Sequence, residues 1–533
     1  MGILGVIFVR KHKRWLALFT LLCLLAGMTG CQQEEVEPSP VEAEAQRQEG
    51  ESIVIATMSE TPSLSPTGHN SVAGSYMNLL TYSTLFRLDE QMNPQPLLVE
   101  KYETVTDTQW EFTLRPEVKF HNGMEMTAAD VKASLEWAKT FPEMRQYTDG
   151  ITSVEVVGQL TFRIHTTTPY ATLLDDLCVH ANAIVPKSLI DAGNDFNKNP
   201  VGSGPYVFTN WVLGDRLEFQ AFSDYFLGEP AIRYMTWKII PQGAARTIAL
   251  EEGEVDFIVE VENKDAQRLR ENPNVEVLEF QSTGPTWLML NNEKPGLDNV
   301  WVRKAINCAI DKEEVIRQAL DGMGTVAISQ TPFNLPGHSE ENADVYDPAL
   351  AAQYLERSGV DPAGIQLSII CSSEAKRRAA QVIEEDLQAI GIQAHIESMD
   401  LATYLATTIE GNYTGAIGGY TASNMVSYMT SVLHSKSIGS TNKTRLRNEE
   451  LDALIDQAAA TVDEQAREEL LRQASALANA LCTQAPLYQP VELRAYNAGL
   501  GGVTINPSGI LYFEEVYWKE GGRVSSAEPS ESF

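Results

Sequence analysis

Between residues 52 and 533 the chain alternates short runs of β-type residues with helical stretches, and this pattern most constrains its fold. The segment 52–57 is predicted to be a strand, and the segments 110–116 and 160–167 carry the alternating apolar and polar residues of half-buried strands. The helical segment 374–391 is followed directly by a predicted strand, 392–399. Strands that alternate with helices are typical of α/β layers. The sequence therefore predicts an α/β fold.

Further helices are expected along the same body. The segments 302–320, 347–359 and 448–480 each have the composition of one helix. Thr127 and Asp130 have the spacing of a capping box, which predicts that another helix begins there.

The first thirty residues have a different character. A basic cluster, Arg10 to Arg14, precedes the uncharged and almost wholly apolar run 15–28. A helix of that length rises only about 21 Å, which is too short for a hydrocarbon core of ~30 Å. A basic flank, a short apolar run and small residues predict a secretory signal peptide over residues 1–30.

The end of this run, Met28-Thr29-Gly30-Cys31, resembles a bacterial lipobox, in which the Cys is lipidated after cleavage just before it. Met28 departs from the Leu that is usual there, and a plain signal peptide is the alternative. Residues 31–51 are rich in Glu and contain no aromatic residue, so they cannot bury enough surface to fold. We expect a lipid-anchored Cys31, an acidic tether over 31–51, and a body held at the outer face of the cell membrane, facing the extracellular or periplasmic side.

The charge balance excludes one class of partner. The chain has 72 acidic and 40 basic residues, a formal net charge of −32. A surface of this sign repels phosphates, so we expect no nucleic-acid partner.

Four cysteines remain in the body, at positions 178, 308, 371 and 482, with no CxxC pair. Disulfides are possible in an exported protein, and four single buried thiols are an equal alternative. The eight histidines are scattered, and HExxH, GxSxG and Walker A motifs do not occur. We therefore predict no metal site, no cofactor and no catalytic residues.

Several motifs, taken in order, identify a family. They are FHNGMEMTAADVKASLEW from Phe120, NPVGSGPYVF from Asn199, KIIPQGAARTIALEEGEVDF from Lys238, and LMLNNEKPGLDNVWVRKAINCAIDKEEVI from Leu288. Each alone reads as a turn, strand or helix. Together they resemble the extracellular solute-binding proteins of ABC transporters, family 5, the peptide- and nickel-binding family, over nearly the whole mature chain.

The resemblance implies a periplasmic-binding-protein-like fold of type II (cluster C), with two α/β lobes, an extra small subdomain and a ligand cleft between the lobes. We expect lobe I to comprise 52–83, 184–285 and 487–525, the inserted subdomain 84–183, and lobe II 286–486. It also implies a monomer that closes on a small solute, most simply a peptide, and docks on an ABC permease in the cytoplasmic membrane.

The expected contacts with the solute are Tyr420, Ser423, Asn424, Trp287 and Tyr206, although each aromatic residue is more often part of a core. Ser423 stands where peptide-binding relatives carry an Asp that holds the amino group of the ligand. The segment 368–373 lacks the Arg that holds a dipeptide carboxylate.

Because both charged anchors are missing, an uncharged-end ligand, a longer peptide held by its backbone, or a sugar fits better than a dipeptide. A nickel chelate is a further alternative. An exported hydrolase with paired carboxylates is the alternative from another class, and turnover of the ligand would distinguish it.

Overall fold

The computed structural model describes residues 50–69, 72–141, 144, 147–148 and 150–524. The predicted signal peptide, Cys31 and nearly all of the tether lie outside this range. The chain from Glu49 onward forms one compact unit. In the described part of the chain, no helix combines the length and apolarity needed to cross a membrane.

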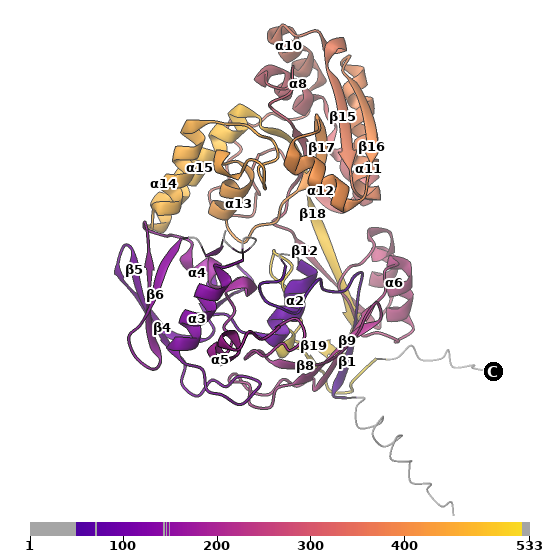
Figure 1. Cartoon of the computed structure of the whole chain (residues 1–533). Helices are drawn as coiled ribbons and strands as arrows, with labels where there is room; N and C mark the ends of the chain where they lie inside the picture. The colour runs from indigo at the N-terminus through magenta and orange to yellow at the C-terminus, as the bar shows by residue number, and fades with distance from the viewer. Residues whose placement is uncertain (1–49, 70–71, 142–143, 145–146, 149, 525–533) are drawn as a thin grey trace, which may run out of the picture. The chain divides into compact units, whose positions relative to one another are not determined.

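One large mixed sheet organises this unit, and the predicted α/β fold is confirmed (Figure 1). Ten strands follow one another across it. In spatial order they are β16 (Gln393–Ser398), β15 (Gln366–Cys371), β17 (Gly415–Gly419), β13 (Thr286–Leu290), β18 (Gln484–Asn497), β11 (Phe257–Ile258), β1 (Ser52–Thr57), β10 (Tyr234–Ile239), β9 (Arg216–Ala221) and β8 (Tyr206–Val212). Two further strands, β12 (Val275–Gln281) and β14 (Gly324–Val326), pair with β18.

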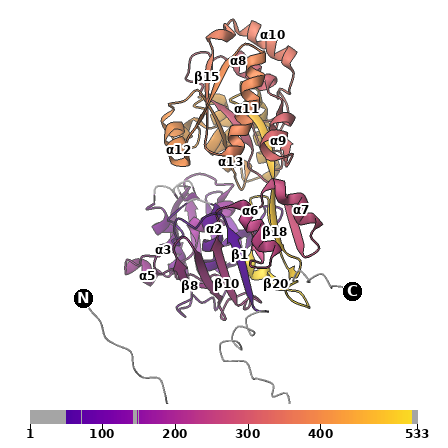
Figure 2. The same cartoon turned by 90° about the vertical axis from the view of Figure 1, so that its right-hand side faces the viewer.

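The long strand β18 joins the two halves of the sheet. Its first part pairs with β13 and β14, and its second part pairs with β11 and β12. Figures 1 and 2 both show β18 running from one group of elements to the other. We call the half that contains β1, β8–β12 lobe I, and the half that contains β13–β17 lobe II.

Lobe I has a parallel centre, in which β1 lies between β10 and β11. Its helices are α2 (Val72–Thr81), α6 (Gly243–Glu251) and α7 (Ala266–Glu271). Its core is aromatic: Trp237 stacks on Tyr76, with ring centroids 5.6 Å apart, and contacts Phe513 edge-on. The small strands β19 (Leu500–Gly501) and β20 (Tyr517–Trp518) form a separate pair.

A four-stranded antiparallel sheet forms the subdomain, in the order β4 (Val99–Thr106), β5 (Gln109–Leu114), β7 (Thr161–Thr166) and β6 (Ile151–Val156). The strands β2 (Phe86–Leu88) and β3 (Pro94–Pro96) and the helices α3 (Ala128–Ala138), α4 (Leu173–Asp176) and α5 (Lys187–Asp191) accompany it. The predicted capping box is confirmed, because the Thr127 N–H donates to the Asp130 carboxylate at 2.9 Å. Phe112 and Phe162 stack at 5.2 Å inside this sheet.

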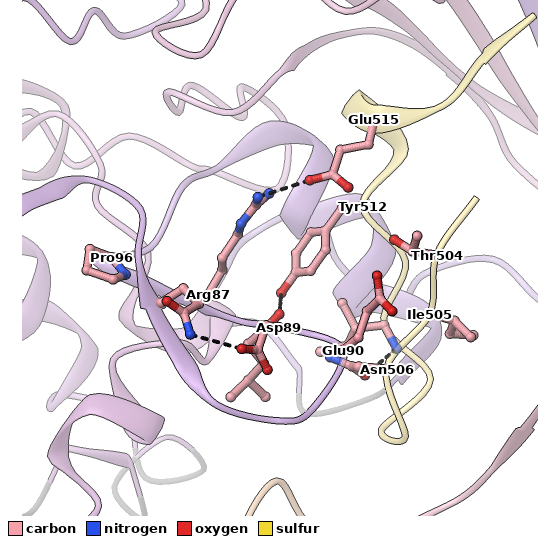
Figure 3. Close-up of a pocket in the computed structure, with 12 residues that line it drawn as sticks. Arg87, Asp89, Glu90, Pro96, Thr504, Ile505, Asn506, Tyr512 and Glu515 are labelled. Atoms are coloured by element: carbon pink, nitrogen blue, oxygen red, sulfur yellow. Dashed lines mark hydrogen bonds and ion pairs between the residues drawn. The ribbon is translucent and has the colours of Figure 1, made fainter. Parts of the chain in front are cut away.

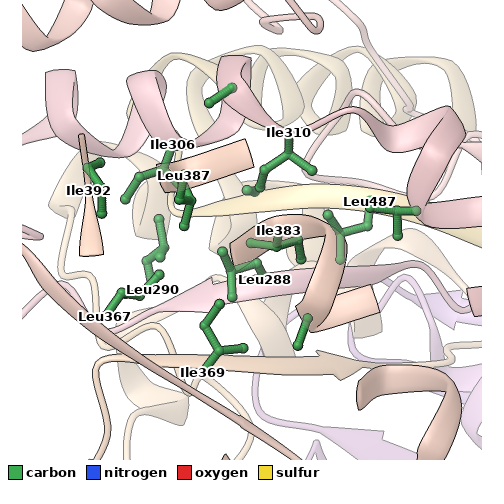
Figure 4. Close-up of a cluster of buried hydrophobic side chains, with 14 of the residues drawn as sticks. Leu288, Leu290, Ile306, Ile310, Leu367, Ile369, Ile383, Leu387, Ile392 and Leu487 are labelled. Atoms are coloured by element: carbon green, nitrogen blue, oxygen red, sulfur yellow. The ribbon is translucent and has the colours of Figure 1, made fainter. Parts of the chain in front are cut away.

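Lobe II carries most of the helices. They are α8 (Val300–Ala309), α9 (Lys312–Leu320), α10 (Pro348–Ser358), α11 (Glu374–Ala389), α12 (Leu401–Glu410), α13 (Met425–Val432), α14 (Glu449–Ala460) and α15 (Glu464–Leu481). Figure 4 shows its core, in which Ile306, Ile383 and Leu387 from the helices meet Leu288 and Ile369 from the strands. All five side chains are fully buried.

Two helices that the sequence predicts as continuous are interrupted. The segment 302–320 forms α8 and α9, because Ile310 and Asp311 are extended and the Asp311 carboxylate caps α9 by accepting from the Glu314 N–H at 3.0 Å. The segment 448–480 likewise forms α14 and α15, and Asp463 caps the second of them. An Asp at an N-cap accepts hydrogen bonds from backbone N–H groups that are otherwise unpaired, so a new helix begins there. The apolar periodicity of the sequence continues across this break.

The four cysteines of the body, Cys178, Cys308, Cys371 and Cys482, are free and buried. Of the two alternatives that the sequence left open, the structure has single buried thiols.

Candidate ligand site between the subdomain and lobe II

The subdomain and lobe II meet at the short helix α4. The backbone N–H of Ala171, just before α4, donates to the carbonyl of Ala459 in α14 at 3.0 Å. In Figure 1, α4 lies directly below α13 and α14. Two cavities flank this contact, and Thr172 lines both.

The larger cavity has a volume of about 710 Å³. This is within the range of roughly 300–1,000 Å³ that is usual for small-molecule sites. Its walls combine tyrosines, small apolar residues and a few polar groups. They are formed by Tyr147, Gly150, Thr168, Pro169, Tyr170, Thr172 and Asp176 from the subdomain side and by Tyr420, Val426, Ser427, Thr430, Ser431, Lys436, Asp456, Ala459 and Ala460 from lobe II.

Tyr420 forms part of the lobe II wall of the larger cavity. It follows β17 directly, and its hydroxyl donates to the Ser431 hydroxyl at 3.0 Å. Burial raises the pKa of Tyr420, so the phenol stays neutral. A neutral phenol beside apolar residues offers a ring face for stacking and a hydroxyl for hydrogen bonding.

The smaller cavity, of about 160 Å³, lies on the other side of α4. Ser423 and Asn424 line it. The Asn424 side chain caps α13 by accepting from the Ser427 N–H at 2.8 Å. Asp175 lines the same cavity, and Arg467 of α15 lies across from it.

Burial raises the pKa of Asp175 to about 6, and the charge of Arg467 and a hydrogen bond with Asn424 oppose this rise. The Asp175 carboxylate, on the subdomain, therefore faces α13 and α15 of lobe II across the smaller cavity.

The structure brings together three of the five expected contacts. Tyr420 lines the larger cavity, and Ser423 and Asn424 line the smaller one. Trp287 and Tyr206 are 3% and 0% exposed and belong to the cores of lobe II and lobe I. Trp287 contacts Tyr428 of α13 edge-on, with ring centroids 6.0 Å apart, so it packs against α13 within the core of lobe II.

Asp175 and Asp176 are two buried or half-buried acidic residues of the site that the sequence analysis did not single out. They belong to the run Leu173-Leu174-Asp175-Asp176-Leu177, which matches no motif. The sequence signal for them is that two adjacent acidic residues stand inside an apolar run. Such a run is expected to be buried, and acidic side chains are seldom buried without a partner.

The motifs that carry the family resemblance are structural. His121 donates its backbone N–H to the Gly202 carbonyl at 2.8 Å, and its ring hydrogen-bonds the Gly204 carbonyl at 3.0 Å. The Asn292 amide donates to three carbonyls around β13, and the Arg303 guanidinium donates to the carbonyls of Leu297, Leu481 and Cys482. These side chains hold loops and helix ends in place through hydrogen bonds to backbone carbonyls, and they do not line the two cavities.

Two crossings of the chain connect the lobes, and they are hydrogen-bonded to each other. The segment 281–285 links β12 to β13, and β18 passes beside it near Gln489 and Pro490. The Ser282 N–H donates to the Pro490 carbonyl at 3.2 Å, and the Gln489 amide donates to the Ser282 carbonyl at 2.8 Å. Two adjacent strands of this kind form a suitable hinge.

Comparisons with known proteins agree with this architecture. The chain is 27% identical to heme-binding protein A of Haemophilus influenzae over 534 aligned residues, covering 92% of this chain and 97% of that protein. It is 30% identical to the glutathione-binding protein GsiB of Salmonella paratyphi A over 67% of this chain and 71% of that protein.

Among solved structures, the periplasmic binding protein DppA of Helicobacter pylori, in complex with the peptide STSA, superposes with a TM-score of 0.78 at 23% identity. The alignment covers 90% of this chain and all of that one. Residues 93–440 match the middle region of the bacterial extracellular solute-binding proteins, family 5. The chain belongs to this family of bacterial extracellular solute-binding proteins.

Proposed function

We propose that the protein captures a peptide between its lobes and delivers it to the membrane permease of an ABC importer. The observation that carries the proposal is the cavity of about 710 Å³ whose walls come from both sides of the contact between the subdomain and lobe II. Such a cavity opens and closes when the lobes move, so the ligand stabilises the closed state in proportion to its preference for that state.

The proposed division of the chain follows from this mechanism. Lobe I comprises 52–83, 184–285 and 487–525, the subdomain comprises 84–183, and lobe II comprises 286–486. The two crossings at 281–285 and near Gln489 act as the hinge. Tyr420, Ser423 and Asn424 are the proposed contacts from lobe II, and the buried Trp287 packs against α13, which carries part of the wall.

Native mass spectrometry tests the proposal. The mature chain carrying Cys31→Ala, purified from a peptide-rich medium, is expected to retain a mass that resolves into peptides. A binding protein returns these peptides intact, whereas a hydrolase releases fragments. Protein that is stabilised by sugars or a nickel chelate, but by no peptide pool, would contradict the peptide assignment.

We further propose that Cys31 is lipidated and holds the monomeric protein at the outer face of the membrane, beside its permease. The acidic segment 31–51 separates the body from a negatively charged surface. Cys31→Ala is expected to move the protein from the membrane fraction to the soluble fraction. The measurement is fractionation followed by immunoblotting, and Cys178→Ala is the matched control, because this thiol is buried in the body. Retention of the Cys31→Ala protein in the membrane fraction would exclude this anchor.

A further inference from the structure

Asp176 is the least well partnered buried carboxylate in the described part of the chain. Three aspartates there are almost fully buried: Asp130, Asp176 and Asp256. Asp130 accepts from the backbone N–H groups of Thr127 and Lys187.

Asp256 accepts from the Val54 N–H and pairs with the Arg523 guanidinium. Asp176 is 4% exposed, and its carboxylate accepts a hydrogen bond from the Tyr170 hydroxyl. No Lys, Arg or His among the described residues lies within ion-pair distance of it.

The other charges of the larger cavity neutralise one another. The Lys436 ammonium pairs with the Asp456 carboxylate at 3.2 Å. Asp456 also faces the His434 ring, which in turn contacts Asp452. Arg467 lies toward Asp175, at the smaller cavity. Among the described residues of this wall, Asp176 is therefore the acidic group that has no counter-charge.

A third cavity, by contrast, holds a cation of the protein itself. It has a volume of about 210 Å³, and Figure 3 shows Arg87 reaching Glu515 within it. Arg87 also pairs with Glu514, and Asp89 accepts from the Gln95 amide at 2.9 Å. A cationic ligand would have to compete with Arg87 there, whereas the partner that the described residues give the Asp176 carboxylate is the Tyr170 hydroxyl.

We propose that Asp176 binds the cationic group of the transported solute, an ammonium or a guanidinium, from the subdomain side of the cleft. A buried carboxylate without a cation is costly, and a ligand cation that hydrogen-bonds to it removes that cost. This inference rests on the proposed solute-binding function. It supplies the acidic anchor that is absent at Ser423, on the opposite wall.

The surroundings of Asp176 define the rest of the ligand. The rings of Tyr170 and Tyr420 and the apolar surfaces of Pro169 and Val426 line the same cavity. They suit a solute with an apolar or aromatic body next to its charged end, and aromatic faces also attract cations. A peptide with a free amino terminus has this chemistry.

Burial raises the pKa of Asp176 well above its usual range, the neighbouring Asp175 adds to the rise, and the Tyr170 hydroxyl opposes it. Ionising this carboxyl group therefore costs free energy, and a bound cation offsets that cost. Replacement of Asp176 by Asn removes a group that is costly to ionise, so Asp176→Asn is expected to fold with a melting temperature equal to or above that of the wild type.

The test uses two synthetic tetrapeptide libraries without Lys, Arg or His, one with free amino termini and one N-acetylated. The mature chain carrying Cys31→Ala is incubated with each library, and retained peptides are measured by native mass spectrometry and titration calorimetry. The wild type is expected to retain the free-amine library at least tenfold more tightly than the acetylated one. Asp176→Asn is expected to lose about 10- to 100-fold in affinity for the free amines. It should bind the acetylated peptides as the wild type does.

Asp191→Asn is the matched control, because Asp191 is exposed at the end of α5 and pairs with Lys187. Equal retention of both libraries by the wild type, or unchanged affinity in Asp176→Asn, would overturn the role of Asp176 while leaving peptide binding intact. Where neither library binds, the peptide assignment fails, and spermidine, arginine and glucosamine are tested against glucose. Binding of an amine that depends on Asp176 then supports the inference, and binding of none of these amines overturns it.

Discussion

Gly204→Ala is expected to lower the free energy of unfolding by about 3 kcal/mol or more, because position 204 has no room for a methyl group. A Cβ atom there would lie 2.4 Å from the Leu80 carbonyl oxygen and 2.5 Å from the Thr81 carbonyl carbon. Both are backbone atoms at the end of α2, so they cannot rotate away as a side chain would. The Gly204 N–H also donates to the Thr81 carbonyl at 3.0 Å, which holds the two segments at this distance.

The measurement is urea unfolding followed by circular dichroism. Gly364→Ala is the control, because a Cβ atom there meets nothing within 4 Å and the backbone is not left-handed. This control is expected to be neutral or slightly stabilising, since alanine restricts the unfolded chain. An unfolding midpoint for Gly204→Ala equal to that of Gly364→Ala would contradict the steric argument.

This prediction assigns a structural reason to the segment NPVGSGPY, one of the motifs that carry the family resemblance. Gly202 and Gly204 both lie against the end of α2, and His121 hydrogen-bonds to both of their carbonyl groups. Two of the motifs by which the family is identified therefore meet in one packing contact. The order of these motifs along the chain carries the resemblance from which the two-lobed fold was expected.

The site was less predictable than the fold. Tyr420, Ser423 and Asn424 are expected from the resemblance, because Ser423 stands where peptide-binding relatives carry an Asp, and all three line cavities. The roles of Asp175 and Asp176 depend on how deeply each is buried and on the side of α4 on which it lies. Both properties follow from the tertiary packing and cannot be predicted from the local sequence. Asp311 is a typical N-cap residue and could have indicated the break in the segment 302–320. The apolar periodicity on both sides of it favours one continuous helix instead.

The lobes are expected to close more readily as the pH falls from 6 to 4, because Asp175 binds its proton more tightly in the closed state. With the subdomain against lobe II, as in this structure, burial raises the pKa of Asp175 to about 6, and separation of the two is expected to return it toward the ordinary value of about 3.9. A carboxyl group whose pKa is higher in the closed state than in the open state stabilises the closed state fully at pH values below the open-state pKa. That stabilisation is lost as the pH rises through the closed-state pKa. Closure therefore weakens between pH 4 and 6 and is constant above that range.

The size of the effect follows from the same linkage. The closing equilibrium changes by up to about tenfold per pH unit within the window. Asp175 is only half-buried, so we expect about tenfold across the whole range. The groups that face it are Arg467, Glu464 and Glu468 from α15, Asn424 from α13, and Asp176 on its own helix.

Distance measurements between two dyes test this expectation in the mature chain carrying Cys31→Ala. The dyes are attached through Leu213→Cys in lobe I and Tyr346→Cys in lobe II, which are both exposed, whereas the four native thiols are buried. Asp175→Asn is expected to remove most of the pH dependence below 6, because the amide does not titrate.

Arg467→Gln removes the cation that opposes the rise in the pKa of Asp175, so its transition is expected to move to higher pH. A profile that Asp175→Asn leaves unchanged would show that another group governs closure. Asp176 would then be the first to examine, because it is buried in the same contact and its pKa is raised further.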